Sequence, residues 1–163
     1  MDPIQQHEIA HGLSLLPAGC FLMTSAFEDE RRGVLVHSVQ ACGTEPQLVA
    51  VAVRKGHAIE PVLRDARAFA LHAVDPGEKL LIRKFSEHLV PDTDLDTDPF
   101  DAFPVGTIAT GSPVLRRPGL VFDCELARHF DLESDFEIYV GLIRAVRLPP
   151  KPKPTANADA QAG

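Results

Sequence analysis

The residues with the clearest chemical potential form a basic turn, Arg54-Lys55-Gly56-His57, between an apolar run and a short amphipathic segment. A helix that begins just after such a turn presents unpaired N–H groups and a partial positive charge, and both suit an anion. Arg54 and Lys55 add full charges, and Gly56 lets a ligand approach the backbone closely. The turn is therefore a candidate phosphate site, and an ordinary solvated turn stays open as an equally good interpretation.

A second group of polar residues lies on an apolar run earlier in the chain. His37 and Ser38, followed by Gln40 and Cys42, alternate with valines. Polar groups interleaved in this way can hydrogen-bond the edge of a heterocyclic ligand. Alternation alone favours the plainer interpretation, in which a strand turns one polar face toward solvent.

An Asp-rich segment resembles a calcium loop but lacks the residues that such a loop requires. Asp92, Asp94 and Asp96 alternate, yet Thr97 replaces the turn glycine and Phe103 stands at the position of the bidentate glutamate. We therefore interpret this segment as a solvated acidic loop.

Motifs for other kinds of chemistry are also incomplete. Residues 106–111 have the glycine spacing of a nucleotide P-loop, but Ser112-Pro113 follows where Lys-Ser/Thr is needed. His7 and His11 lie four residues apart with no third metal ligand in evidence. The chain contains three widely spaced cysteines and no Gly-x-Ser-x-Gly elbow. We expect reduced cysteines that pack in the core, no structural metal and no hydrolase chemistry.

Length and charge limit the classes of protein to which the chain can belong. Its 163 residues suffice for one domain with a proper core. Lys and Arg number 16 against 23 Asp and Glu, and this net charge of −7 disfavours nucleic acid and anionic lipid as partners. No apolar run approaches the roughly 20 residues that cross a bilayer, and the N-terminus lacks the pattern of a secretion signal. We expect a cytoplasmic protein.

The elements that must position these residues are mostly strands. Residues 148–163 are rich in Pro and Ala, which predicts a disordered tail after a folded domain of residues 1–147. Within that domain the patterns predict strands at 18–26, 33–42, 46–54, 67–74, 106–110, 119–127 and 136–146, helices at 58–66 and 77–89, and a loop at 90–104. Six or so strands with two short helices indicate a closed or nearly closed antiparallel barrel.

Two local features of the later strands lead to specific expectations. In residues 119–127 the alternation predicts that Leu120, Phe122, Cys124 and Leu126 share one face, with Asp123 and Glu125 on the other. Gly141, inside the last strand, predicts a bulge or a close approach of another group to the backbone.

The order of these segments resembles the flavin reductase family, whose members are Greek-key split β-barrels that bind FMN, with short flanking helices. The resemblance runs over about 130 residues. It is carried by LSLLPAGCFLMTSA, by the block from RRGVLVHSVQACG to RAFALHAV, by KLLIRKFS, and by the stretch from GSPVLRRPGLVFDCELA to FEIYVGLIRAV.

The resemblance assigns roles to particular residues. It implies that residues 35–38 line the flavin and its ribityl chain, and that Gln40 and Cys42 lie near the polar edge of the ring. It places the phosphate at Lys55, Gly56 and His57, in agreement with the anion site inferred above. The full set of cofactor-binding residues implied is Leu35, Val36, His37, Ser38, Gln40, Cys42, Lys55, Gly56, His57 and Phe85.

The resemblance also implies an activity and an assembly. A homodimer would bind FMN in a groove between its subunits and pass hydride from NAD(P)H to the flavin. Electrons would then go on to a downstream acceptor. The alternatives are a flavin-binding or electron-carrier protein without turnover, a barrel that binds pyridoxal phosphate or haem, and a barrel without any ligand.

The chain departs from the family at several positions. Leu35, His37 and Ile59 stand where the family often has hydroxyl residues, which implies fewer side-chain contacts to FMN. The family's Gly-Asp-His before the last strand reads Ser134-Asp135-Phe136 in this chain. Loss of that histidine bears on the nicotinamide step more than on flavin binding.

Overall fold

The computed structural model of the chain describes residues 2–86 and 97–154. The three aspartates of the acidic loop and the end of the helix predicted at 77–89 lie outside the described residues, as does most of the predicted tail. Residues 148–154, the described part of that tail, have no regular secondary structure.

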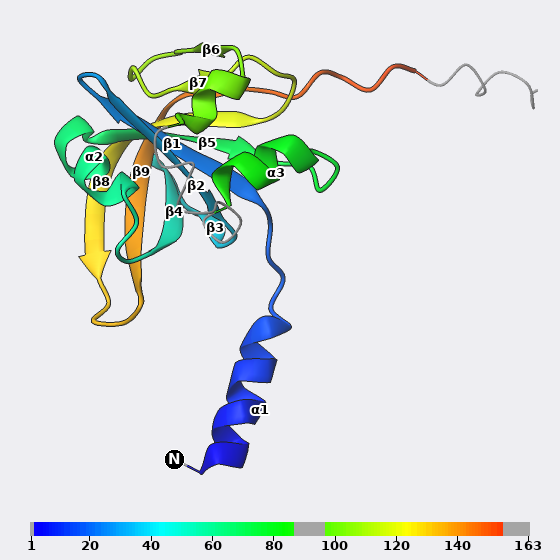
Figure 1. The fold of residues 1–163 in the computed structure, drawn as a ribbon, viewed down its shortest axis with the longest axis vertical. Coiled ribbons are helices and arrows are strands. Elements are labelled where there is room, and N and C mark those ends of the chain that lie inside the picture. The colour runs from blue at the N-terminus through cyan, green and yellow to red at the C-terminus, as the bar shows by residue number, and fades with distance from the viewer. Residues whose placement is uncertain (1, 87–96, 155–163) are drawn as a thin grey trace, which may run out of the picture.

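The protein is mainly β and is built on one seven-stranded sheet in which all neighbours are antiparallel (Figure 1). The strand order is β2-β1-β5-β8-β9-β4-β3. The strands are β1 (Phe21–Phe27), β2 (Glu30–Val36), β3 (Val39–Thr44), β4 (Gln47–Arg54), β5 (Ala68–Ala73), β8 (Val121–Asp131) and β9 (Phe136–Arg147). A separate pair, β6 (Val105–Gly106) and β7 (Val114–Leu115), lies beside the sheet.

The two edge strands of this sheet are consecutive in the chain. β2 ends at Val36 and β3 begins at Val39, so the short link His37-Ser38 carries the chain from one edge to the other. Because two residues cannot span a flat sheet of seven strands, the sheet must curl until its edges approach each other. The hydrogen bond from the Ala52 N–H to the Ser38 carbonyl (3.0 Å) continues the pairing of β3 with β4 into the link, and β2 itself contacts β4.

Within residues 2–86 and 97–154, four helical segments accompany the sheet: α1 (Pro3–Ser14), α2 (Ile59–Ala66), α3 (Lys79–Phe85) and the 3-10 turn η3 (Pro99–Ala102). α1 projects away from the sheet in Figure 1, and none of its residues is buried. α2 packs on β1 and β2 through Ile59, Val62 and Leu63, whose spacing puts them on one face. No described helix is long and apolar enough to cross a membrane.

The main hydrophobic core lies between α2 and the side of the sheet that α2 covers. Fully buried members include Met23, Val51, Phe69 and Leu71, which come from three different strands. A second cluster joins Leu22 to α3, η3 and β7 through Phe85, Phe100 and Leu115. The strand predicted at 46–54 is confirmed as β4, but burial on both faces, which its apolar run suggests, is not: Val49, Val51 and Val53 are buried, and the residues between them are half-buried.

The strand predicted at 33–42 is two strands. β2 pairs with β1, with Val36 opposite Phe21, whereas β3 pairs with β4, with Val39 opposite Val51. Val34 and Val36 of β2 are buried, whereas β3 is mostly exposed. Apolar residues nevertheless continue on both sides of His37-Ser38, so the sequence pattern hides the change of partner there. The turn expected before this strand is also shorter, since β1 ends at Phe27 and β2 begins at Glu30.

The alternation expected for 119–127 is wrong at Asp123. A bulge between Asp123 and Cys124 leaves both residues fully buried. The Asp123 carboxylate accepts hydrogen bonds from the backbone N–H groups of Ala109 (2.7 Å) and Thr110 (2.9 Å). The strand predicted at 106–110 is therefore wrong beyond Gly106, the last residue of β6. The N–H groups of Ala109 and Thr110 donate to the Asp123 carboxylate and not to a neighbouring strand.

The expectation for Gly141 is confirmed as a close approach. A Cβ atom on Gly141 would lie 2.5 Å from the Phe69 Cζ and 2.8 Å from the Cys124 Cβ. No side chain larger than hydrogen fits there without displacing the core, so the glycine lets β9 lie tightly against Phe69.

Candidate flavin site

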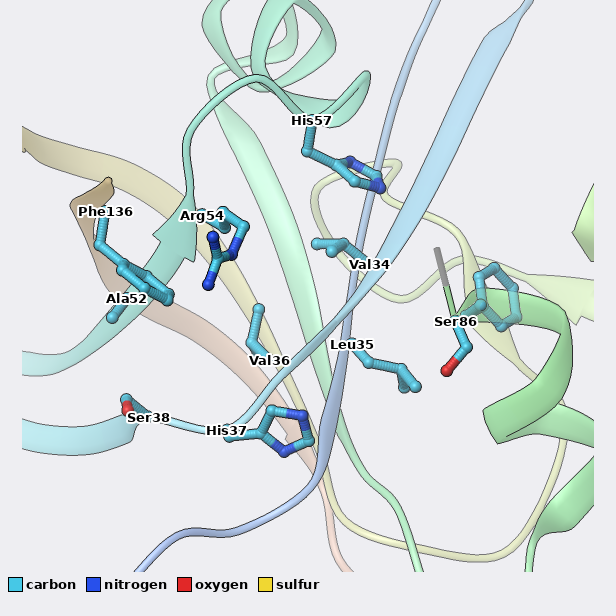
Figure 2. A pocket seen from close by; sticks show the side chains of 11 residues that line it. Val34, Leu35, Val36, His37, Ser38, Ala52, Arg54, His57, Ser86 and Phe136 are labelled. Atoms are coloured by element: carbon cyan, nitrogen blue, oxygen red, sulfur yellow. The ribbon is translucent and has the colours of Figure 1, made fainter. Parts of the chain in front are cut away.

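A cavity of about 320 Å³ lies beside the His37-Ser38 link that joins the two edge strands of the sheet. Its walls come from β2, the His37-Ser38 link, the end of β4, the turn before α2, the end of α3 and the first residue of β9 (Figure 2). The lining residues are Val34, Leu35, Val36, His37, Ser38, Ala52, Arg54, His57, Phe85, Ser86 and Phe136.

One wall of the cavity is apolar and is formed by β2. Val34 and Val36 are almost fully buried, and Leu35 between them is half-buried. Beyond the strand, the His37 Nδ1 lies 3.0 Å from the Gly19 carbonyl, which fixes the orientation of the ring. The wall therefore offers an apolar surface that ends in a polar rim at His37 and Ser38.

Phe85 closes the cavity from the α3 side, and its position depends on a glycine. A Cβ atom on Gly33 would lie 2.6 Å from the Phe85 Cε1, so the ring occupies space that only glycine leaves open. The ring is further held by Phe100, edge-on at 5.1 Å, and by Phe103, stacked at 6.0 Å. These contacts fix one end of the cavity.

Arg54 and Phe136 form the opposite side of the cavity, as Figure 2 shows. They face each other across β4 and β9, and the Arg54 guanidinium carbon lies 5.1 Å from the centre of the Phe136 ring. Asp135 lies 3.7 Å from the same guanidinium. Phe136, where the resemblance implies a histidine, therefore lines the cavity.

The predicted phosphate turn is partly in the cavity and partly beside it. His57 lines the cavity, and its Nδ1 accepts a hydrogen bond from the Ile59 N–H (3.0 Å) at the start of α2. Lys55 and Gly56 lie outside the lining: the Lys55 ammonium pairs with Asp131, and the Gly56 N–H donates to the Glu60 carboxylate. Gly56 adopts φ +84°, which explains a glycine in this turn.

The structure brings six of the ten predicted residues together around one cavity. These are Leu35, Val36, His37, Ser38, His57 and Phe85. Gln40 and Cys42 lie on β3 just beyond the lining, with Gln40 opposite Ala50 and with Cys42 exposed. Val34, Ala52 and Ser86 line the cavity but are not among the residues predicted from the sequence. Arg54 is predicted only to add positive charge to the turn, not to line the site. The predicted strand at 33–42 begins at Gly33, but nothing in the sequence indicates that this glycine admits Phe85.

The lining suits a flat aromatic ligand with an anionic tail. The volume is in the range of about 300–1,000 Å³ that small-molecule sites occupy. An apolar wall at Val34 and Val36 can take one face of a ring, while Arg54 and His57 give one end a basic character. Among the residues that the structure describes, no group of His, Cys, Asp or Glu could hold a metal ion.

Comparison with known proteins identifies the family. The model of the flavin reductase like domain matches residues 13–161, so the chain belongs to the flavin reductase-like domain family. The resemblance inferred from the sequence is confirmed.

Known proteins of similar sequence are much longer. Diflavin flavoprotein A 1 of Synechocystis sp. is 22% identical over 133 residues, and putative diflavin flavoprotein A 3 of Nostoc sp. is 23% identical over 133 residues. Each alignment covers 81% of this chain and 22% of the relative, so the chain spans about a fifth of the length of these proteins.

Solved structures share the fold. Nitrilotriacetate monooxygenase component B from Mycobacterium thermoresistibile superposes with a TM-score of 0.78 at 18% identity, covering 93% of this chain and 80% of that one. The NADH:FAD oxidoreductase SgcE6 of Streptomyces globisporus C-1027 has a TM-score of 0.75 at 21% identity, covering 91% and 86%. An FMN-binding protein from Thermus thermophilus has a TM-score of 0.70 at 19% identity, covering 82% and 72%.

Proposed function

We propose that the protein binds FMN in this cavity and acts as an NAD(P)H-dependent flavin reductase with a split-barrel architecture. The observation that carries the proposal is the cavity itself, which combines an apolar wall on β2 with basic groups at Arg54 and His57. A bound flavin supplies the redox chemistry, because its ring accepts hydride from a nicotinamide. No nucleophilic side chain is required of the protein.

The residues of the cavity wall would bind and orient the ring. Leu35 and Val36 would lie along the flavin and the ribityl chain, and Ser38 would contribute its hydroxyl and backbone groups. Phe85, fixed by its two aromatic neighbours, would limit how far the ring enters. Gln40 and Cys42, just beyond the lining, would border the polar edge of the ring.

The phosphate would lie at the turn before α2. Lys55, Gly56 and His57 follow Arg54, which lines the cavity, so the cationic side chains of Arg54 and Lys55 come from one end of the site. Replacing Lys55 by Ala is expected to weaken FMN binding by about 1.5–3 kcal/mol, the usual worth of a hydrogen bond to a charged group. Unchanged affinity would reject Lys55 as a ligand of the phosphate.

A homodimer is supported by the outer face of β4 and β9. Three apolar pairs, each half-buried, face each other across these strands: Leu48 with Leu142, Ala50 with Val140, and Ala52 with Ile138. Ala52 also lines the cavity, so a second copy of the chain on this face would cover the ligand as well. We further propose a cytoplasmic location.

A carrier or store of flavin without turnover is the second candidate, and Phe136 favours it. This ring stands in the cavity where the family resemblance implies a histidine, with the Arg54 guanidinium against it. A phenylalanine can neither donate nor accept the hydrogen bond that an imidazole would offer to a nicotinamide.

Anaerobic reduction separates the two candidates. The purified protein is loaded with FMN, and its visible spectrum is followed after addition of excess NADH or excess NADPH. Loss of the oxidised flavin bands with either nucleotide supports the reductase. A flavin that stays oxidised with both, yet is reduced by dithionite, supports the carrier. A spectrum typical of pyridoxal phosphate or haem in the protein as purified would reject the flavin assignment.

A further inference from the structure

The positive groups at the turn before α2 are each matched by an acid. Lys55 pairs with Asp131, and the Gly56 N–H donates to Glu60. The Arg54 guanidinium lies near Asp135. Counting these side chains alone, two cations face three carboxylates, so the turn has no surplus of positive charge to offer to a phosphate.

The Asp131 carboxylate is held in position by a second hydrogen bond within the β8–β9 hairpin. Asp131 is the last residue of β8, and its carboxylate also accepts a hydrogen bond from the Glu133 N–H (2.7 Å) in the turn before β9. The hydrogen bond from Lys55, followed by the one from Glu133, lowers the pKa of Asp131 from its ordinary value. The carboxylate is therefore charged throughout the neutral range.

The Lys55–Asp131 pair is also exposed enough to exchange partners. The Lys55 side chain is 30% exposed and the Asp131 side chain 56%. Ion pairs at such positions contribute little to stability, because water solvates both charges. Lys55 can therefore leave Asp131 for a stronger anion without breaking the fold.

We propose that Asp131 is an intramolecular competitor for Lys55, and that this competition sets how strongly the site prefers a phosphorylated flavin to riboflavin. The inference rests on the proposed phosphate position. A phosphate monoester carries about −1.5 to −2 charges at neutral pH, so it must draw Lys55 away from Asp131 while lying close to that carboxylate. Riboflavin has the same ring but no phosphate, so it binds without drawing Lys55 away from Asp131. Asp131 acts through Lys55 and is a positioning residue.

The test compares the dissociation constants of FMN and riboflavin, each measured by titration of flavin fluorescence. Asp131→Asn removes the competing charge and keeps the size of the side chain. We expect it to tighten FMN binding by about three- to tenfold, from the worth of an exposed ion pair and the relief of repulsion. Riboflavin binding is expected to stay within twofold. A change in folding alone would move both ligands together.

Glu125→Gln is the matched control. Glu125 also lies on β8, and its side chain is 54% exposed. Its carboxylate pairs with the guanidinium of Arg144 on β9 (2.6 Å). Its replacement changes the net charge by the same amount and is expected to leave the ratio of the two affinities unchanged. A similar gain for FMN in this variant would mean that overall charge, and not Asp131, sets the preference.

Lys55→Ala and the double variant separate failure of the inference from failure of the proposed function. If Lys55→Ala lowers the preference for FMN and Asp131→Asn does not raise it, the competition is rejected and the phosphate position stands. If neither variant changes the preference, the phosphate position itself is rejected. If the gain from Asp131→Asn is just as large in the Lys55→Ala background, it comes from direct repulsion alone, and competition for Lys55 is overturned.

Discussion

His72 predicts a specific dependence of stability on pH. This histidine of β5 is fully buried. Its Nδ1 lies 3.1 Å from the Leu22 carbonyl, and its Nε2 lies 3.1 Å from the Leu115 N–H. The first nitrogen must donate and the second must accept, so the neutral ring satisfies both partners. Protonation would put a hydrogen where Nε2 accepts one, inside a site that excludes water.

The size of the effect follows from the pKa of the ring. Burial, the largest cause, lowers the pKa of His72 from 6.5 to about 4. Below pH 6.5 the unfolded chain takes up a proton that the folded chain refuses, so the free energy of unfolding falls as the pH falls and levels off below about 4. The full loss is about 3 kcal/mol, and about 2 kcal/mol of it is reached by pH 5.

Urea unfolding at pH 7.5 and at pH 5 measures this loss, with His72→Gln as the reference. The variant is less stable at both pH values because it loses a buried partner, but the part of the pH dependence due to His72 disappears. A proton NMR titration of the wild-type histidines is an independent readout. A His72 resonance that titrates near pH 6.5, or an equal pH dependence in the two proteins, would refute this account of the buried ring.

Two further predictions concern packing and assembly. Gly141→Ala places a methyl group against Phe69 and is expected to destabilise the fold by about 1–3 kcal/mol in thermal or urea unfolding. Gly12→Ala in α1 is the control, because a Cβ atom there meets nothing within 4 Å. Equal stability of the two variants would contradict the close approach at Gly141. Leu142→Arg, on the apolar outer face of β9, is expected to yield a particle of half the wild-type mass and weaker FMN binding in light scattering and titration. Ile108→Arg, at an exposed apolar residue outside β4 and β9, is its control, and a wild-type protein that is already monomeric would reject the proposed interface.

Much of the fold could be predicted from local pattern, because the elements concerned are buried in a regular way. β4 alternates in burial along its whole length, and α2 has one apolar face, so both agree with the periods of strand and helix. The division between β2 and β3 could not be predicted, because it depends on which strands they pair with. The bulge at Asp123 depends likewise on a distant loop that donates two N–H groups to it.

The site was only partly predictable for the same reason. The turn at Lys55 and His57 is marked by its own residue types. What that turn contacts is not: Asp131 and Phe136 approach it from the β8–β9 hairpin, far along the chain. Gly33 admits Phe85 in a similar way, through a contact between residues more than fifty positions apart. Local sequence showed where basic groups lie, and only the fold showed which acids neutralise them.

The cavity itself is tested most directly by an FMN titration of the wild-type protein and of Ala52→Leu. Ala52 lines the cavity, and a leucine there fills space that a ring would use. The same substitution at Ala26, in β1 and outside the lining, is the control. We predict a perturbed flavin spectrum with one FMN bound per chain in the wild type and the control, and binding weakened at least tenfold in Ala52→Leu. Equal affinity in all three proteins, or no binding to the wild type, would contradict a flavin site at this cavity.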